Sequence, residues 1–547
     1  MSFSTHEVIN QAVPLAGHDV FGTDRALVEA VEREGAAAHR DELHELGQLA
    51  GSERFQEHGR LAEEHPPVLR THDRFGRRLD VVEYHPSYHE LMRTAIAHGL
   101  HAAPWASGRA GAHVARAAKI ITWYQVDGGH ICPISMTYSV VPALRHQPDL
   151  AAEWEPRITS FDYDGSNRPA EQKRGVTCGM AMTEKQGGSD VRANRTTARP
   201  DAAGGPGAHR LLGHKWFCSA PMSDGFLMLA QAPDGLTCFW VPRWCPDGSR
   251  NPIRIQRLKD KLGDRSNASS EIELEEAWGR QVGGAGHGVR TIIEMVNHTR
   301  LDCVLGSAAI MRQGTAQATW HTHHRAAFGR TLDDHPLMRS VLADLAIESE
   351  AAAAAALRLA RCFDAPANDE HEQALKRLAT PVVKYWTCKR APQHAAEALE
   401  CLGGNGFVEE SGMPRLFRQS PLNGVWEGSG NVICLDVLRA IARQPASLDA
   451  FLAEVDLGRG ADERLDGAID TLGKELADGT DVEARARRIV EQMATVFQGS
   501  LLVRHAPAEV ADAFCTSRFG HDVRGAFGTL PPGLDVAAII ERARPLD

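Results

Sequence analysis

The spacing of hydrophobic positions predicts a chain that is helical at first, then rich in β-strands, and then helical again. Apolar residues recur at helical spacing in residues 25–39, 88–98 and 112–126. A polar stretch with histidine and proline, residues 65–86, predicts an extended excursion before the second helix.

The middle of the chain shows the pattern of a small all-β domain. Its β-prone runs are separated by Pro, Gly and Asp clusters and cover residues 225–231, 236–242, 253–258 and 271–274. The sequence PDAAGGPG at residues 200–207 predicts the tip of a hairpin.

From Gly286 onward the helical pattern returns. Residues 336–363 contain six consecutive alanines and predict a long, largely buried helix. A second helix is expected at residues 380–401, where Gly403 and Gly404 stop it. A break near Pro445 introduces a last helical segment. We therefore predict an α+β protein with domains at residues 1–177, 178–282, 283–444 and 445–547.

Composition excludes several classes of protein. Hydrophobic residues make up 43% and charged residues 24% of the 547 positions, as in ordinary globular proteins. No apolar run is long enough for a membrane span, and the first residues do not resemble a secretory signal. The eleven cysteines lack a CxxC pair, which predicts buried thiols and a cytoplasmic protein. We predict no metal site, because His321, His323 and His324 cannot converge on one side of a helix.

Three short motifs carry the candidate chemistry: MTEKQGGSD at Met182–Asp190, GHKWFCS at Gly213–Ser219 and WEGSGN at Trp426–Asn431. The first offers hydroxyl donors and a Gly-Gly pair that permits close backbone approach. Taken alone, it is equally well an ordinary turn, and the aromatic residues of the second motif are more often core. Glu427 in the third motif could simply be an acidic residue at the start of a helix near Val432.

Together, in this order, the motifs resemble the flavin-binding and catalytic motifs of the acyl-CoA dehydrogenase family. Further stretches resemble its AidB-like branch, which belongs to the bacterial response to alkylating agents: residues 10–15, 66–76, 85–89, 132–137 and 261–269. The resemblance covers nearly the whole chain. It implies a helical domain, a middle β-barrel, a helical bundle and an extra C-terminal helical domain. It also implies FAD as cofactor, a homotetramer and an electron-transfer flavoprotein as partner.

The resemblance assigns FAD contacts to residues in five places. Phe217 would pack against the flavin ring and Ser219 would bind its polar edge. Arg325 of an Arg-x-x-Phe-Gly motif would meet the pyrophosphate of a neighbouring subunit's FAD. The full set of expected contacts is Met182, Thr183, Gly188, Ser189, Phe217, Ser219, Arg325, Phe328, Gly403, Gly404, Trp426, Ser429 and Asn431.

Glu427 is the expected catalytic base, which would remove the α-proton of an acyl-CoA while the β-hydrogen leaves as hydride. Trp426 is bulkier than the tyrosine most often found there, so we expect slow turnover or short branched acyl groups such as isovaleryl. The alternatives are a flavin-containing DNA-binding protein without acyl-CoA turnover, and a flavoprotein whose FAD only stabilises the tetramer.

The resemblance also implies nonspecific binding of double-stranded DNA through arginines near the C-terminus. The candidates are Arg439, Arg485, Arg487, Arg488, Arg504, Arg518 and Arg524. Charge argues against a basic domain: residues 446–547 contain 11 Lys and Arg against 18 Asp and Glu, and the whole chain has a net charge of −11. The cluster Arg485–Arg488 is more often a solvated helix face than a phosphate site.

Overall fold

The structure, a computed structural model, describes residues 5–520 and 524–545, which form two compact units. The barrel unit comprises residues 54–112 and 126–302, and the helical unit comprises residues 1–53, 113–125 and 303–547. Helices dominate, and a single large sheet lies in the barrel unit, so the predicted α+β class is confirmed. The four-domain division stays a prediction.

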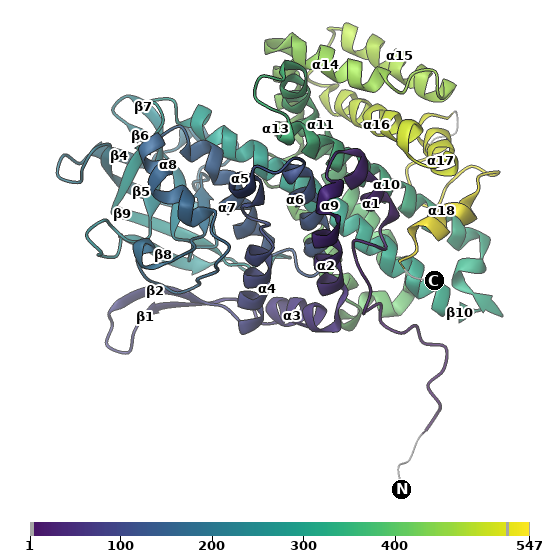
Figure 1. Ribbon diagram of the computed structural model, residues 1–547, viewed down its shortest axis with the longest axis horizontal. Helices are drawn as coiled ribbons and strands as arrows, with labels where there is room; N and C mark the ends of the chain where they lie inside the picture. The colour runs from purple at the N-terminus through teal and green to yellow at the C-terminus, as the bar shows by residue number, and fades with distance from the viewer. Residues whose placement is uncertain (1–4, 521–523, 546–547) are drawn as a thin grey trace. The chain divides into compact units, whose positions relative to one another are not determined.

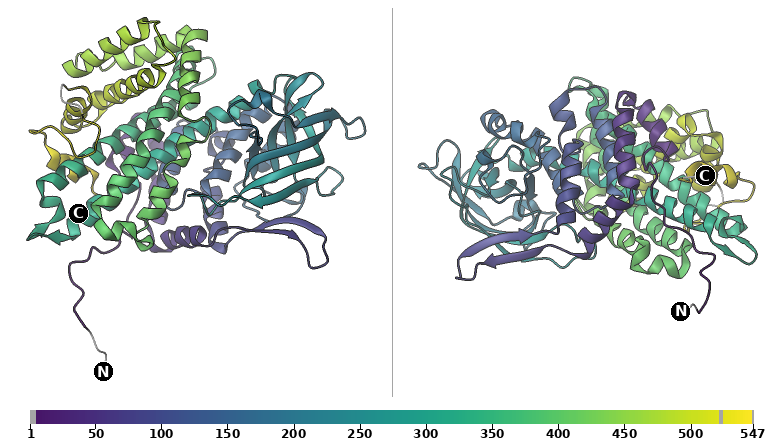
Figure 2. Two further views of the ribbon diagram at one scale, coloured as in Figure 1. Left: turned by 180° about the vertical axis from the view of Figure 1, so that it is seen from behind. Right: turned by 60° about the horizontal axis from the view of Figure 1, so that its bottom comes forward.

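The sheet of the barrel unit closes on itself. Strand β6 pairs with both β4 and β7, and β9 joins β7 to β5, which pairs with β4, so five strands form a ring. Strand β3 pairs with β6 and β8 pairs with β9, which extends the sheet. Figure 2 shows the sheet in blue and teal from two further directions. The strands are β3 Cys178–Ala181, β4 Thr197–Pro200, β5 Ala208–Ser219, β6 Gly225–Ala232, β7 Gly235–Pro242, β8 Ile253–Leu258 and β9 Ser269–Val282. The predicted hairpin tip joins β4 to β5 as expected.

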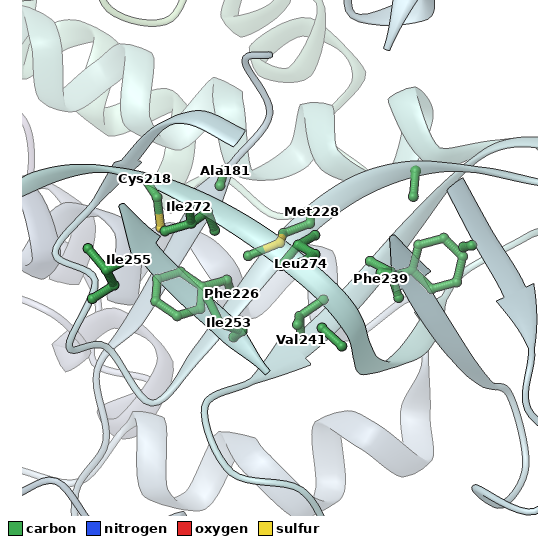
Figure 3. Packing of buried hydrophobic residues seen from close by; sticks show 14 of the residues in the cluster. Ala181, Cys218, Phe226, Met228, Phe239, Val241, Ile253, Ile255, Ile272 and Leu274 are labelled. Carbon is green, nitrogen blue, oxygen red and sulfur yellow. The ribbon is translucent and has the colours of Figure 1, made fainter. Parts of the chain in front are cut away.

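The ring encloses an apolar core. Phe226, Met228, Phe239 and Leu274 are each at most 1% exposed and come from three different strands (Figure 3). Cys218 of β5 also lies in this core. Because side chains alternate along a strand, its neighbours Phe217 and Ser219 face away from the core, where Phe217 is 48% exposed.

The helices that lie wholly or almost wholly in the barrel unit precede the sheet in sequence. They are α3 Glu53–Glu64, α4 Pro86–Ala97, α5 Ala103–Ser107, α7 Ile131–Leu144 and α8 Pro148–Ile158, with short 3-10 turns at Ala170–Gln172 and Val191–Ala193. The expected extended excursion is a hairpin, formed by β1 Val68–His72 and β2 Arg78–Glu83.

The helical unit begins with a shorter helix than predicted. Helix α1, Arg25–Arg33, ends because Gly35 adopts a left-handed φ of 88°, and a 3-10 turn, Ala37–His39, follows. The other helices before the long C-terminal ones are α2 Arg40–Gly51, α6 Ala112–Tyr124 and α9 Gly288–His324, which runs through both units.

Two long helices form the centre of the helical unit. Helix α10, Pro336–Asp364, matches the predicted helix, and its alanine run is buried on all sides. Helix α11, Glu370–Cys401, starts ten residues earlier than predicted because Asp369 caps its N-terminus by accepting from the Glu372 N–H. The connecting elements are β10 Ala326–Ala327, β11 Arg330–Thr331, α12 Met413–Gln419, α13 Gly430–Arg443 and 3-10 turns at Leu332–Asp334, Gly403–Phe407, Glu409–Ser411 and Leu422–Gly424.

The C-terminal extension packs on these helices. Its members are α14 Pro445–Asp456, α15 Glu463–Ala477, α16 Ala486–His505, α17 Ala508–Phe519 and α18 Val536–Ala543. Helix α14 lies along α11, and α16 contacts α10, α11 and α13 (Figure 1). The predicted break is confirmed, since α13 ends at Arg443 and Pro445 opens α14.

Candidate active site

The loop after β3 carries the first motif, and a buried ion pair joins this loop to β5. The Glu184 carboxylate lies 2.7 Å from the Lys215 ammonium of β5, and both side chains are fully shielded from solvent. Glu184 also accepts from the Arg195 and Thr196 N–H groups, and Lys215 donates to the Leu229 carbonyl. Burial alone raises the pKa of Glu184, but Lys215 and these donors outweigh it and bring the pKa to about 2.

Residues Met182, Thr183, Gly188 and Ser189 lie on this loop, at its surface or half-buried. A Cβ at Gly188 would come within 2.6 Å of the Thr183 hydroxyl, so a larger residue here would displace the Thr183 side chain. The two hydroxyl residues are therefore presented by a tightly packed turn. We identify the Glu184–Lys215 pair as a feature that motif inspection missed, although both residues stand inside the motifs.

Next to the loop, β5 presents Phe217 and Ser219 on its outer side. The Lys259 ammonium lies 3.5 Å from the ring centroid of Trp216 and 4.6 Å from that of Phe217. The Ser219 hydroxyl is half-buried, 3.5 Å from that of Ser269. Together they provide an open aromatic face, a positive charge and hydroxyl groups, all within the barrel unit.

The Arg-x-x-Phe-Gly motif forms the β10–β11 hairpin of the helical unit. Phe328 at its tip is 96% exposed and adopts a left-handed φ of 53°. The side-chain amide of Asn10, in the N-terminal segment, donates to the Ala326 carbonyl at 2.8 Å and accepts from the Ala326 N–H at 2.7 Å. The backbone carbonyl of Asn10 accepts from the Arg325 guanidinium. A branch-specific stretch of sequence thus holds this hairpin.

The predicted glycine turn is open to solvent. Gly403 and Gly404 are exposed, and a Cβ at either would meet nothing within 4 Å. Phe407, in the same 3-10 turn, is 81% exposed. The turn and the hairpin therefore both present exposed aromatic rings and backbone.

Glu427 lies in a strained turn at the entrance of α13. Its φ is 57° and that of Gly428 is 107°, so two successive residues adopt left-handed backbone. A non-glycine residue in this region costs about 1–3 kcal/mol, and such strain clusters at functional sites. The side chain is half-buried and its Oε2 atom is shielded from solvent.

A buried lysine holds this turn. The Lys384 ammonium of α11 donates to the Gly428 carbonyl at 2.6 Å, and Lys384 is 1% exposed. In the described part of the chain, no carboxylate forms an ion pair with Lys384. The turn beside Glu427 is thus fixed by a buried positive charge that sequence inspection did not single out.

Trp426, Ser429 and Asn431 flank Glu427. Trp426 is half-buried, whereas Ser429 and Asn431 are exposed. Ser429 is the N-cap of α13 but makes no side-chain capping bond, and the first turn contains no acidic residue. Asn431 accepts from the Arg487 Nε at 2.7 Å.

Most of the candidate DNA-binding arginines contact carboxylates. Arg485 and Arg488 both bind Glu475, Arg504 binds the buried Glu454, and Arg439 lies 3.6 Å from Asp436. Arg518 bridges Asp344 and Glu348 and is only 14% exposed. Arg524 is exposed. Their role in DNA binding stays a prediction.

The expected FAD contacts and the expected base, Glu427, thus fall into two groups. Met182, Thr183, Gly188, Ser189, Phe217 and Ser219 lie in the barrel unit, and Arg325, Phe328, Gly403, Gly404, Trp426, Glu427, Ser429 and Asn431 lie in the helical unit. Across residues 5–520 and 524–545, no group of His, Cys, Asp or Glu side chains is arranged to hold a metal ion. The same residues contain no helix with the length and hydropathy of a membrane span.

Comparison with known proteins assigns the family. Residues 10–165 match the adaptive response protein AidB N-terminal domain, residues 179–277 the acyl-CoA dehydrogenase middle domain, and residues 286–442 its C-terminal domain. AidB of Escherichia coli strain K12 is 44% identical over 94% of both chains. Acyl-CoA dehydrogenase family member 11 of Caenorhabditis elegans is 30% identical over 82% of this chain and 77% of its own.

The solved structures agree with this assignment. The crystal structure of C. elegans ACDH-11 in complex with C11-CoA superposes with a TM-score of 0.86 at 28% identity, covering 96% of this chain and 95% of that one. The expected acyl-CoA dehydrogenase fold is therefore confirmed. The chain belongs to the AidB-like branch of the acyl-CoA dehydrogenase family.

Proposed function

We propose that this protein oxidises the α–β carbon bond of a short, branched acyl-CoA, with Glu427 as the base. As a member of the family, the chain is an FAD-dependent oxidoreductase acting on CH–CH donors. The proposal adds the substrate class and the role of each residue. The observation that carries it is the strained turn of Glu427, held by Lys384.

The residues present fit FAD. Phe217 and Ser219 offer an open ring and a hydroxyl on the same side of β5. The N-terminus of α13 lacks a side-chain cap, and a Cβ at Gly430 would lie 3.0 Å from the Lys389 side chain and 3.4 Å from that of Arg487. An uncapped helix N-terminus beside two cations favours an anion such as the pyrophosphate.

Glu427 performs the proton transfer. Its carboxylate takes the α-proton, and the electrons of that C–H bond form the new carbon–carbon double bond. The chemistry that bound FAD would supply is acceptance of the hydride from the β-carbon. The strained backbone fixes the direction of the carboxylate before substrate binds, so orientation costs less when the reaction occurs.

The half-buried Trp426 supports a short or branched acyl group, because a bulky ring beside the base leaves less room. The C. elegans relative was solved with C11-CoA, so a long straight chain is the competing class. The panel of substrates must contain both.

The test is an anaerobic titration of the flavin absorbance with isovaleryl-CoA and with straight-chain thioesters of four to eleven carbons. We expect isovaleryl-CoA to bleach the flavin and Glu427→Gln to lose more than about 10²-fold in reduction rate, as expected for a general base. Glu276→Gln is the matched control, since Glu276 also has a left-handed φ, of 60°, but lies in the barrel unit. Faster bleaching by the C11 thioester would contradict the substrate class, and equal rates in Glu427→Gln would contradict the base.

We propose further that FAD binding is shared between subunits of a homotetramer, with an electron-transfer flavoprotein as electron acceptor. The exposed rings of Phe328 and Phe407 support shared binding, because such side chains usually find a partner surface. Native mass spectrometry checks the tetramer. A monomer that retains FAD would contradict shared binding.

A second proposal is nonspecific duplex DNA binding in the response to alkylation. It is supported by the exposed guanidiniums of Arg439 and Arg488, which are 54% and 66% accessible. Both face carboxylates, so we expect weak, salt-sensitive binding, to be measured by anisotropy of a labelled duplex.

A further inference from the structure

The C-terminal extension reaches the segment that carries the base. The Arg487 Nε of α16 donates to the Asn431 Oδ1 in the first turn of α13, across 56 positions of sequence. The guanidinium also lies beside Gly430, where a Cβ would come within 3.4 Å of its Nη2 atom. One arginine of the extension therefore binds Asn431 and lies next to Gly430 at the start of α13.

Arg487 differs from the neighbouring arginines in the group that its guanidinium binds. Arg485 and Arg488 both form ion pairs with Glu475. Arg487 has no carboxylate partner in the described ranges of the chain and binds a neutral amide instead. Its positive charge adds to that of Lys389 and to the positive end of the α13 dipole, and no acidic residue of the first turn offsets it.

Three positive contributions at one helix start favour a bound anion over water. A cation at this end of a helix is otherwise unfavourable, because it faces the positive end of the helix dipole. The hydrogen bond to Asn431 offsets part of this cost, and a phosphate group nearby would offset the rest. The arrangement is thus best explained if Arg487 serves a negatively charged ligand at α13.

We propose that Arg487 is a positioning residue of the cofactor site, by which the extension orients Asn431 and supplies charge for the FAD pyrophosphate. This rests on the proposed function, since it requires FAD at the N-terminus of α13. It assigns the extension a role in flavin binding in addition to covering α10 and α11.

The test uses the full-length protein and two readouts that do not depend on turnover. We compare Arg487→Gln, Arg487→Lys and the matched control Arg488→Gln. The first readout is the dissociation constant of FAD, from flavin fluorescence on reconstitution of the apoprotein. The second is hydrogen exchange of peptides covering residues 428–436 without FAD.

Arg487→Gln is expected to weaken FAD binding about tenfold, since a hydrogen bond to a charged group contributes on this scale. Exchange of residues 428–436 should rise, whereas Arg488→Gln should match the wild type in both readouts. Arg487→Lys keeps the charge without the planar fork, so its FAD affinity should lie between the two.

The proposal is overturned if Arg487→Gln binds FAD as the wild type does, or if Arg488→Gln shows an equal loss. Unchanged exchange at residues 428–436 in Arg487→Gln would overturn the positioning of Asn431. These outcomes are independent of the thioester titration. A wild type that no thioester reduces would refute the proposed reaction and leave the FAD measurement decisive for Arg487.

Discussion

Replacing Lys215 with methionine removes the cation beneath the first flavin motif. Glu184 is ionised inside the barrel unit with a pKa of about 2, compared with an ordinary value of 4.5. That difference corresponds to about 3 kcal/mol of stabilisation of the ionised form. Breaking a buried ion pair typically costs about 3–5 kcal/mol, which agrees with the energy obtained from the pKa shift. We expect the lower end, because the Arg195 and Thr196 N–H groups still bind the carboxylate.

The pH dependence follows from the sign of the shift. In the wild type the folded pKa of Glu184 is depressed, so its contribution to stability is present above pH 4.5 and lost as pH falls towards 2. In Lys215→Met the ammonium that lowers the pKa of Glu184 is absent, so this pKa is higher than in the wild type. The carboxylate is then protonated at a higher pH, so the penalty should shrink as the pH falls.

The assay is urea-induced release of FAD, followed by flavin fluorescence. The free energy of unfolding typically falls by about 1–3 kcal/mol per molar urea, so a loss of about 3 kcal/mol in this free energy lowers the urea midpoint by about 1–3 M. Lys185→Met is the matched control, because Lys185 neighbours Glu184 but is exposed. The double variant Glu184→Gln/Lys215→Met should recover part of the loss. Equal midpoints for Lys215→Met and Lys185→Met would refute the argument.

Three further predictions concern the helical unit. Burial alone would raise the pKa of Glu348, but Arg390 and Arg518 outweigh it and bring this pKa to about 2, so the stability of the wild type should fall as the pH drops from 4.5 towards 2. The urea midpoint of Arg518→Gln should depend less on pH than that of the wild type, whereas Arg439→Gln should keep the wild-type dependence. Asn10→Ala should raise hydrogen exchange at residues 325–331 and weaken FAD binding, whereas the exposed Asn368→Ala should change neither. Affinity for a labelled DNA duplex should fall more than about tenfold from 50 to 200 mM salt, and salt-independent binding would contradict this prediction. Arg518→Gln should weaken the affinity less than Arg488→Gln does, because the Arg518 guanidinium already binds Asp344 and Glu348.

Much of the fold could be predicted because the signals are local. The alanine run and its apolar flanks define α10, and the Pro-Gly cluster at residues 200–207 defines the β4–β5 turn. Local signals also explain the errors. Gly35 divides the first predicted helix, and Asp369 moves the start of α11, since capping and left-handed glycine override apolar periodicity.

The candidate site is less predictable, because its supports come from distant positions. Glu184 and Lys215 each stand in a recognised motif, but nothing in either motif shows that they form a pair. Arg487 belongs to a basic cluster whose sequence suggests a solvated helix face or a phosphate site. Only the structure shows that Arg487 binds Asn431, whereas Arg485 and Arg488 both form ion pairs with Glu475.

The turn at Glu427 is contacted by two cations from distant positions of the helical unit. A left-handed glutamate is unfavourable by about 1–3 kcal/mol and persists only where the surroundings determine it. Lys384 donates to the Gly428 carbonyl, and Arg487 donates to the Asn431 side chain. Their helices, α11 and α16, begin 57 residues before and 59 residues after Glu427. The six-residue motif therefore contains the proposed base but neither of the cations that contact the motif. A change at either cation should disturb the proposed proton transfer without altering the motif, which is why the presence of the motif alone is insufficient to infer activity.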